Sequence, residues 1–371
     1  MAAFHDELLE IEEPDRPELP VEKVRNFYVT TIGGLEDVVL KDLKAHLKSL
    51  THVRIERSRR HGRIFFTYTR SPKHLLNLRS VEQVFALLDD IRGITVGQPG
   101  LIRIAERVAR VDLVPAAVLH DILHGPKGLP GFQLSCTVGS RHRFSASEMH
   151  QVVRTVLDMK YEVDLEEAER PYPLRLQVIG KRALFGLQLS DRTVRERTYR
   201  RVRVEGDPEP VLAYCLSLIL GIDPRDVILD PRCGGATALI EMGLGNKVQA
   251  LIGGDVYPEV LLAASANLQE ALVPGRLMCF DATDIPFRDA TVDKVVGNLL
   301  RRKGEPPLFL SKWVGEIRRV LRPGRRAVFL LDGRMQSRGV IDEVGGFKIL
   351  MEQTIHLRGK RPSVCLIQKI G

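Results

Sequence analysis

The sequence is poor in cysteine and in aromatic residues, and it has no long hydrophobic run. Its five cysteines are scattered without a Cys-x-x-Cys pair, which argues against a disulfide framework and a cysteine-based zinc site. No stretch of about 18 apolar residues occurs, so no bilayer-spanning helix and no membrane partner are expected. The acidic first residues lack the basic-then-apolar pattern of a secretory signal. Together these absences predict a chain that stays in a reducing cytoplasm.

Several common catalytic patterns are also missing. The histidines show no metal-ligand spacing, and no Gly-x-Ser-x-Gly elbow occurs. With one tryptophan and 6% aromatic residues, the chain is not built mainly from base-stacking platforms. We therefore expect no resident metal and no serine nucleophile.

The charge balance, by contrast, points to a partner. Lysine and arginine number 55 against 47 acids, a formal net charge of +8. Such a surplus favours a polyanion, because phosphate neutralisation releases counterions, although charge alone also fits a merely basic soluble protein. The segment Asp191–Arg203 concentrates six arginines beside only two acids, Asp191 and Glu196. It is either a solvated surface or a linker that contacts phosphate.

The first half of the chain has mixed α and β patterns. Residues 1–22 are rich in acids and proline and predict a flexible acidic tail. Residues 23–95 predict a small α+β unit, with strands at 26–32 and 63–69 and helices at 35–50, 71–78 and 81–88. Residues 96–190 predict a second α+β unit, with helices at 114–123 and 145–160 and strands at 132–138, 174–179 and 183–189.

From Val211 the pattern changes to a helix followed by alternating strands and helices. Short apolar strands are expected at 227–230, 250–254, 276–280, 294–296 and 326–331, and a closing hairpin at 347–353 and 363–369. This alternation is typical of a doubly wound α/β sheet, here with seven strands.

A glycine turn follows the first of these strands. The strand ends at Asp230, Gly234 and Gly235 form a tight turn, and a helix begins near Ala236. Glycine lets a ligand approach the backbone closely, and the free N–H groups of a helix start favour an anion. A glycine pair alone is weak support for a ligand site, so its weight depends on the polar residues that follow.

Polar side chains also end the next three strands. Asp255 can accept the hydroxyls of a ribose. Asp281 can accept from an adenine amino group, with the Ala282 N–H beside the ring, and Asn298 ends the fourth strand. Since the carboxyl ends of parallel strands meet at one sheet edge, the set predicts a nucleoside cofactor site.

The stretch Asp-Pro-Arg-Cys-Gly-Gly-Ala-Thr, with these strand-end residues, resembles the Rossmann-type S-adenosylmethionine methyltransferases. It is most similar to the RNA guanine-N2 methyltransferases that carry a THUMP domain, the TrmN-like family. Phe27-Tyr-Val-Thr-Thr-Ile-Gly-Gly-Leu-Glu-Asp looks like that family's opening strand and helix, and Tyr199-Arg-Arg-Val-Arg like its linker. The resemblance implies a ferredoxin-like unit (23–95), a THUMP RNA-binding domain (96–190), a basic linker (191–210) and a Rossmann-like methyltransferase domain (211–371).

The resemblance also implies a role for each strand-end residue. Asp230 would lie near the methionine part of S-adenosylmethionine, and Gly234 would line it. Asp255 would hold the ribose, Asp281 and Ala282 the adenine, and Asn298 would be the catalytic amide. In the family, an Asn or Asp oxygen and the next carbonyl accept the N–H bonds of the guanine amino group, and an aromatic residue stacks on the flipped base.

The chain departs from the family pattern at two places. Ala236 replaces the second glycine of the loop, and Gly235 replaces a serine. After the fourth strand, where the family has Asn/Asp-Pro-Pro-Tyr/Phe or Asp-Leu-Pro-Phe, this chain has Asn298-Leu299-Leu300-Arg301. The rigid prolines and the stacking ring are therefore gone, whereas the amide acceptor is kept.

These observations predict an S-adenosylmethionine-dependent methyltransferase that acts on structured RNA, with tRNA first, and forms N2-methylguanosine in the acceptor stem. The alternative is an RNA-binding protein with an inactive methyltransferase fold. A nucleotide-dependent oxidoreductase is disfavoured, because the loop lacks Gly-x-Gly-x-x-Gly. The need for a small activating subunit stays open. The candidate RNA contacts are Arg57, Arg59, Arg60, Arg63, Arg141, Arg143, Arg197, Arg200 and Arg301.

Overall fold

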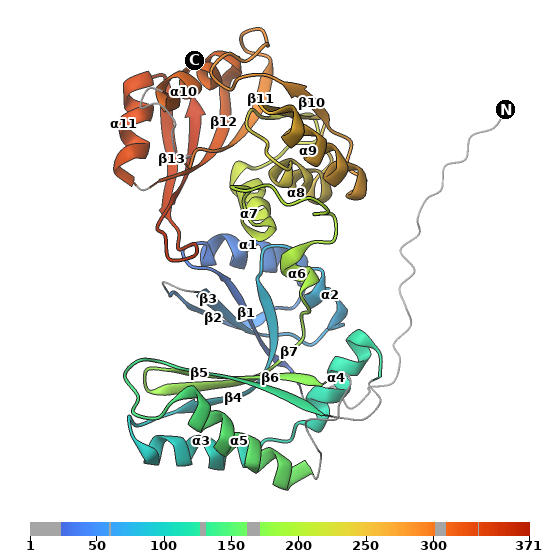
Figure 1. Ribbon diagram of the computed structural model, residues 1–371, viewed down its shortest axis with the longest axis vertical. Coiled ribbons are helices and arrows are strands. Elements are labelled where there is room, and N and C mark those ends of the chain that lie inside the picture. Colours follow the sequence, from blue (N-terminus) through green and yellow to red (C-terminus); the bar gives the residue numbers. More distant parts are fainter. Residues whose placement is uncertain (1–23, 59–60, 127–130, 162–170, 301–308, 333) are drawn as a thin grey trace, which may run out of the picture.

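The computed structural model contains two seven-stranded sheets, one in each half of the chain (Figure 1). It describes residues 24–58, 61–126, 131–161, 171–300, 309–332 and 334–371. The expected tail at 1–22 lies outside these residues. Among the helices described, none is long and apolar enough to cross a membrane.

The N-terminal sheet has the strand order β2-β3-β1-β4-β7-β6-β5 and is antiparallel except for the β5–β6 pair. Helices α1, α3 and α5 pack on one of its faces through a common apolar core. The strands are β1 (Asn26–Ile32), β2 (Thr51–Glu56), β3 (His61–Thr67), β4 (Gln83–Arg92), β5 (Phe132–Val138), β6 (Tyr172–Ile179) and β7 (Arg182–Gln188). The helices are α1 (Glu36–His46), α2 (Lys73–Leu76), α3 (Gln98–Arg110), α4 (Val114–His124), α5 (Ala146–Tyr161) and α6 (Thr193–Glu196).

Strand β4 corrects the helix predicted at 81–88. Val81, Val84, Phe85 and Leu88 have helical spacing, but β4 pairs with β1 on one side and β7 on the other. Its residues are apolar on both faces, because Val84 and Phe85 are both buried. A strand buried on both faces lacks the polar alternation that would mark it in the sequence. Through β4 the strands of both predicted N-terminal units form one sheet.

The C-terminal sheet, in the order β10-β9-β8-β11-β12-β14-β13, confirms the predicted seven-stranded doubly wound arrangement. It is parallel from β10 to β12, and β14 is antiparallel to both of its neighbours. The strands are β8 (Val227–Asp230), β9 (Ala250–Asp255), β10 (Arg276–Cys279), β11 (Val292–Asn298), β12 (Leu321–Leu331), β13 (Phe347–Thr354) and β14 (Ser363–Lys369). The helices are α7 (Pro210–Leu220), α8 (Thr237–Gly245), α9 (Pro258–Glu270), α10 (Phe309–Val320) and α11 (Arg334–Val344).

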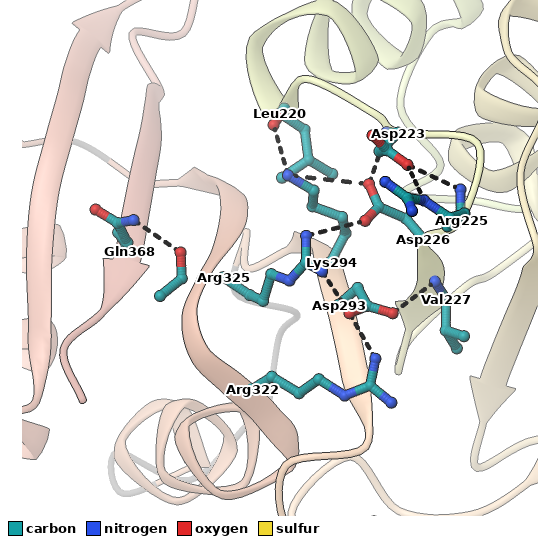
Figure 2. A network of polar contacts seen from close by, with 11 residues as sticks. Leu220, Asp223, Arg225, Asp226, Val227, Asp293, Lys294, Arg322, Arg325 and Gln368 are labelled. Carbon is teal, nitrogen blue, oxygen red and sulfur yellow. Dashed lines mark hydrogen bonds and ion pairs between the residues drawn. The ribbon is translucent and has the colours of Figure 1, made fainter.

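A buried polar network fixes the amino ends of β8 and β11 (Figure 2). The Asp293 carboxylate accepts the Val227 N–H at 3.0 Å and pairs with Arg322 at 2.6 Å. Asp226 pairs with Arg325 at 3.5 Å and with Lys294 at 4.0 Å. These contacts set the register of the two central strands at the edge opposite their polar carboxyl ends.

The two halves of the chain are joined by contacts besides the linker. Helix α8 carries Glu241, whose fully buried carboxylate accepts from Arg79 of the N-terminal half at 2.7 Å. The same carboxylate accepts from Arg197 at 3.2 Å and from the Tyr199 hydroxyl at 2.8 Å. The β13–β14 hairpin reaches down to the N-terminal half (Figure 1), where the His356 N–H donates to the Gly33 carbonyl at 2.9 Å.

Candidate active site

A cavity of about 820 Å³ lies at the carboxyl ends of β8, β11 and β12. Asp230, Asn298 and Asp332, which end or follow these strands, line it. Its other walls come from the linker residues 204–208 and from residues 357–362 of the β13–β14 hairpin. Of the predicted cofactor and catalytic residues, Asp230 and Asn298 line this cavity beside the linker. Gly234, Asp255, Asp281 and Ala282 are not among its lining residues.

The glycine turn between β8 and α8 borders this cavity. Gly234 has a φ of +55°, which glycine adopts without steric cost, and a Cβ built on it would fall on the Asp207 carboxylate. Ala236, at φ +62°, also takes the left-handed backbone, at the position where the family has its second glycine. The turn thus leaves no room for side chains at its tip.

Asp207 is a site residue that the sequence analysis missed. Its carboxylate accepts the Gly235 N–H at 3.0 Å and the Thr237 hydroxyl at 3.2 Å, at the start of α8. The negative charge therefore satisfies the helix N-terminus from within the protein. No local pattern marks Asp207, because it lies in the linker and reaches the site only through the fold.

Asp230 is buried, and its carboxylate accepts the Arg232 N–H at 3.1 Å. Burial raises the pKa of Asp230 to about 7, and the negative charges of Asp207 and Asp255 add to this shift. Three carboxylates consequently converge on the glycine turn, and together they favour a cationic group in the cavity.

This cluster predicts a pH dependence of cofactor binding. A cationic ligand binds the ionised form of Asp230, so binding is weakened when the pH falls below the pKa of about 7. We expect affinity for S-adenosylmethionine to be about tenfold lower at pH 6 than at pH 8. Calorimetric titration of wild type and Asp230→Asn checks this, and an equally steep profile in the variant would contradict it.

Asp255 ends β9 and is almost fully buried. Its carboxylate accepts the N–H groups of Gly234 at 3.2 Å and Tyr257 at 3.3 Å, so it is fixed beside the glycine turn. Val256 and Tyr257, which follow it, are about half exposed and offer apolar surface to a nucleobase (51% and 49%). This geometry suits a ribose on Asp255 with its base on the neighbouring apolar side chains.

Asp281 and Ala282 follow β10 at the same sheet edge but are not among the residues that line the cavity. The Asp281 carboxylate accepts the N–H and the hydroxyl of Thr283, at 2.8 and 2.9 Å. Their contact with adenine stays a prediction.

Asn298 is held from two sides. Its side-chain amide donates to the Gly206 carbonyl of the linker at 2.7 Å. Its side-chain oxygen accepts the Leu300 N–H at 3.3 Å. In the Asn-Pro-Pro pattern a proline at the position of Leu300 has no N–H to donate, so this intramolecular contact is specific to the present sequence. The Asn298 oxygen keeps a second lone pair for a substrate.

The residues present fit S-adenosylmethionine. Its sulfonium and ammonium groups match the acidic cluster of Asp207, Asp230 and Asp255, and its ribose hydroxyls match Asp255. Among the residues described, no group of three or more histidine, cysteine or acidic side chains is placed to hold a metal ion.

The fold and the site define a Rossmann-type, S-adenosylmethionine-dependent methyltransferase. Residues 197–362 match the UPF0020 family, described as the RMKL-like methyltransferase domain. Both the class and the cofactor predicted from the sequence are thereby confirmed. Three comparisons show which known proteins the chain is similar to.

The tRNA (guanine(6)-N2)-methyltransferase of Thermus thermophilus is 26% identical over 255 residues, which cover 66% of this chain and 74% of that protein. The mouse U6 snRNA (guanine-N(2))-methyltransferase THUMPD2 is 24% identical over 199 residues. This aligned region covers 53% of the present chain and only 37% of the mouse protein. The crystal structure of TrmN from Thermus thermophilus superposes with a TM-score of 0.73 at 24% identity, covering 93% of this chain and 99% of that one.

The candidate RNA contacts have different surroundings. Arg57, which is exposed, pairs with Asp37 at 2.7 Å. Arg197 and Arg200 are mostly buried and pair with Glu241 and Glu209, so the structure gives both an intramolecular partner. Arg141 and Arg143 are exposed, Arg63 is buried, and Arg59, Arg60 and Arg301 lie outside the described residues. Contact of these arginines with RNA stays a prediction.

Proposed function

We propose that this protein methylates the N2 amino group of a guanine in RNA, with the acceptor stem of tRNA as the substrate and the cytoplasm as its location. The support is that both named relatives are guanine-N2 methyltransferases of RNA, although they differ in the RNA. Within this proposal residues 23–95 are a ferredoxin-like unit, 96–190 a THUMP RNA-binding domain and 191–210 the linker to the methyltransferase domain.

The single observation that carries the reaction is Asn298 at the wall of the acidic cavity. S-adenosylmethionine supplies, when bound, a methyl group on a positively charged sulfur. The guanine amino group is a poor nucleophile, because its lone pair is delocalised into the ring. The Asn298 oxygen and the Leu299 carbonyl accept its two N–H bonds and so orient that lone pair toward the methyl group. The contact of Asn298 with Gly206 keeps the acceptor oriented.

Replacing Asn298 with alanine tests this role. We expect kcat for RNA methylation to fall about a hundredfold, since one acceptor that stabilises the transition state is lost. Cofactor affinity should change by less than about twofold. The matched control is Asn26→Ala, at an exposed position in the N-terminal half. Unchanged kcat in the Asn298 variant would show that another group orients the base.

A second function, RNA binding by an inactive methyltransferase fold, is favoured by two observations at Asn298 and its motif. The Leu300 N–H occupies one lone pair of the Asn298 oxygen, and the stacking aromatic residue is absent from the motif. Titration with S-adenosylmethionine separates the two functions. Micromolar binding with methyl transfer to tRNA supports the enzyme, whereas RNA binding without any cofactor heat supports the inactive fold.

A further inference from the structure

The N-terminal sheet is curled so strongly that strands far apart in its order touch. Arg63 on β3 donates to the Gln177 side chain on β6 at 2.7 Å, although β1, β4 and β7 lie between them. In a flat sheet these two strands would be about 19 Å apart. Arg182 on β7 likewise pairs with Glu56 on β2. The face that does not carry α1, α3 and α5 is therefore concave, and we term it the inner face.

Aromatic side chains form the floor of the inner face. Tyr28, Phe65, Phe85 and Leu184 make a buried cluster, and the Tyr28 and Phe85 rings stack with centroids 4.6 Å apart. Gly186 leaves the space for the Tyr28 ring. Among the described residues the Tyr28 hydroxyl has no hydrogen-bond partner. The floor thus presents a polar atom that the fold itself does not use.

Arginines surround this floor with too few carboxylates to neutralise them. Arg63 is only 6% exposed, its Nε has no partner, and it forms no ion pair with any described residue. Arg175, on β6, has no hydrogen-bond or ion-pair partner among the described residues either. Burial lowers the pKa of Arg63, and the positive charges of Arg182 and Arg175 lower it further. Burying a cation without an ionic partner lowers the stability of the folded protein.

A hollow of about 410 Å³ opens beside these arginines. Apart from Gly93 its lining is entirely cationic, consisting of Arg54, Arg92, Lys181 and Arg182. The two acids nearby, Glu56 and Asp90, are already paired with the arginines of the lining. With Arg63 and Arg175 included, six cationic side chains stand against these two carboxylates, so the hollow has a surplus of positive charge.

We propose that this hollow binds a backbone phosphate of the RNA substrate. Guanidinium groups form paired hydrogen bonds with phosphate oxygens, and Lys181 adds a cation that has no partner among the described side chains. Arg63 and Arg175 act from behind the lining by raising the positive potential in a region of low dielectric constant. The proposal rests on the proposed function, because it assigns part of the RNA-binding surface of the same enzyme.

The deciding variant is Lys181→Gln in the full chain, with Lys247→Gln as its control. Both lysines are exposed, but Lys247 lies near the start of β9 in the other half. We expect tRNA affinity to fall about tenfold in Lys181→Gln, and the slope of log affinity against log salt to fall by about 1. The control should stay within about twofold of wild type. Equal affinity of the two variants would overturn the proposal.

Arg63→Met distinguishes a binding role from a structural one. We expect its unfolding temperature to equal or exceed that of wild type, because an unpaired buried cation is removed, while tRNA affinity falls about tenfold. A lower unfolding temperature with unchanged affinity would assign Arg63 to the core alone.

Inorganic phosphate, compared with chloride at matched ionic strength, separates a free anion from an RNA phosphate. We expect phosphate to compete with tRNA for wild type and less for Lys181→Gln. Phosphate that raises the unfolding temperature through Lys181 without competing with tRNA would overturn the assignment to RNA. These readouts measure binding only, so a wild-type protein that binds tRNA through the hollow without methylating it would refute the proposed function and leave this inference standing.

Discussion

Asp255→Ala is expected to weaken S-adenosylmethionine binding about a hundredfold or more. The carboxylate is buried beside the glycine turn, and the sequence predicts that it accepts both ribose hydroxyls. Hydrogen bonds to a charged group contribute about 1.5–3 kcal/mol each, so the loss of two corresponds to at least about a hundredfold in affinity. Isothermal titration calorimetry with S-adenosylmethionine measures the effect.

Because Asp255 also accepts the Gly234 and Tyr257 N–H groups, the alanine variant needs a control for folding. Gly234 and Tyr257 donate to different oxygens of Asp255, so Asp255→Asn keeps one of the two backbone contacts and should bind with intermediate affinity. Asp289→Asn, at an exposed carboxylate that pairs with Arg319, is the matched change elsewhere. If Asp255→Ala is folded and binds the cofactor as wild type does, the ribose site lies elsewhere.

Glu241→Gln is expected to cause the largest loss of stability. The carboxylate is fully buried and accepts from Arg79, Arg197 and Tyr199. Neutralising it leaves Arg197, whose side chain is 9% exposed, without a charged partner. Breaking a buried pair in this way costs about 3–5 kcal/mol of the free energy of unfolding. Urea denaturation followed by circular dichroism measures the change.

Glu270→Gln is the control for this prediction. Glu270 pairs with Arg201 at 3.3 Å, but both side chains are exposed, so the change should cost less than about 1 kcal/mol. Equal denaturation midpoints of the two variants would mean that the Glu241 cluster does not bind the halves together.

Much of the C-terminal half could be predicted from its sequence, because each short apolar strand there is bounded by turns. The predicted bounds of β8 and β14 match the structure. Strand β4 could not be recognised, because its apolar residues are buried on both faces and imitate a helical stripe. The spacing of apolar residues identifies a strand only where buried and exposed positions alternate, and in β4 they do not.

The candidate site shows the same limit. Asp230 and Asn298 follow apolar strands, so their place at one sheet edge could be inferred, and Asp332 after β12 carries the same signal. Asp207 and Gly206 follow no such strand. They contact Gly235 and Asn298 only because the folded linker passes beside the sheet edge. The ion pair between Glu241 and Arg79 could not be predicted either, because the two residues are far apart in the sequence.

The linker residues 204–208 connect the halves and also form a wall of the cofactor cavity. For protein engineering, this means that the catalytic half cannot be cut out at a boundary after residue 208 and fused to a foreign RNA-binding module. Such a hybrid would lose the carboxylate at the start of α8 and the carbonyl that orients Asn298. A functional chimaera therefore needs the linker of the same protein that supplies its catalytic half.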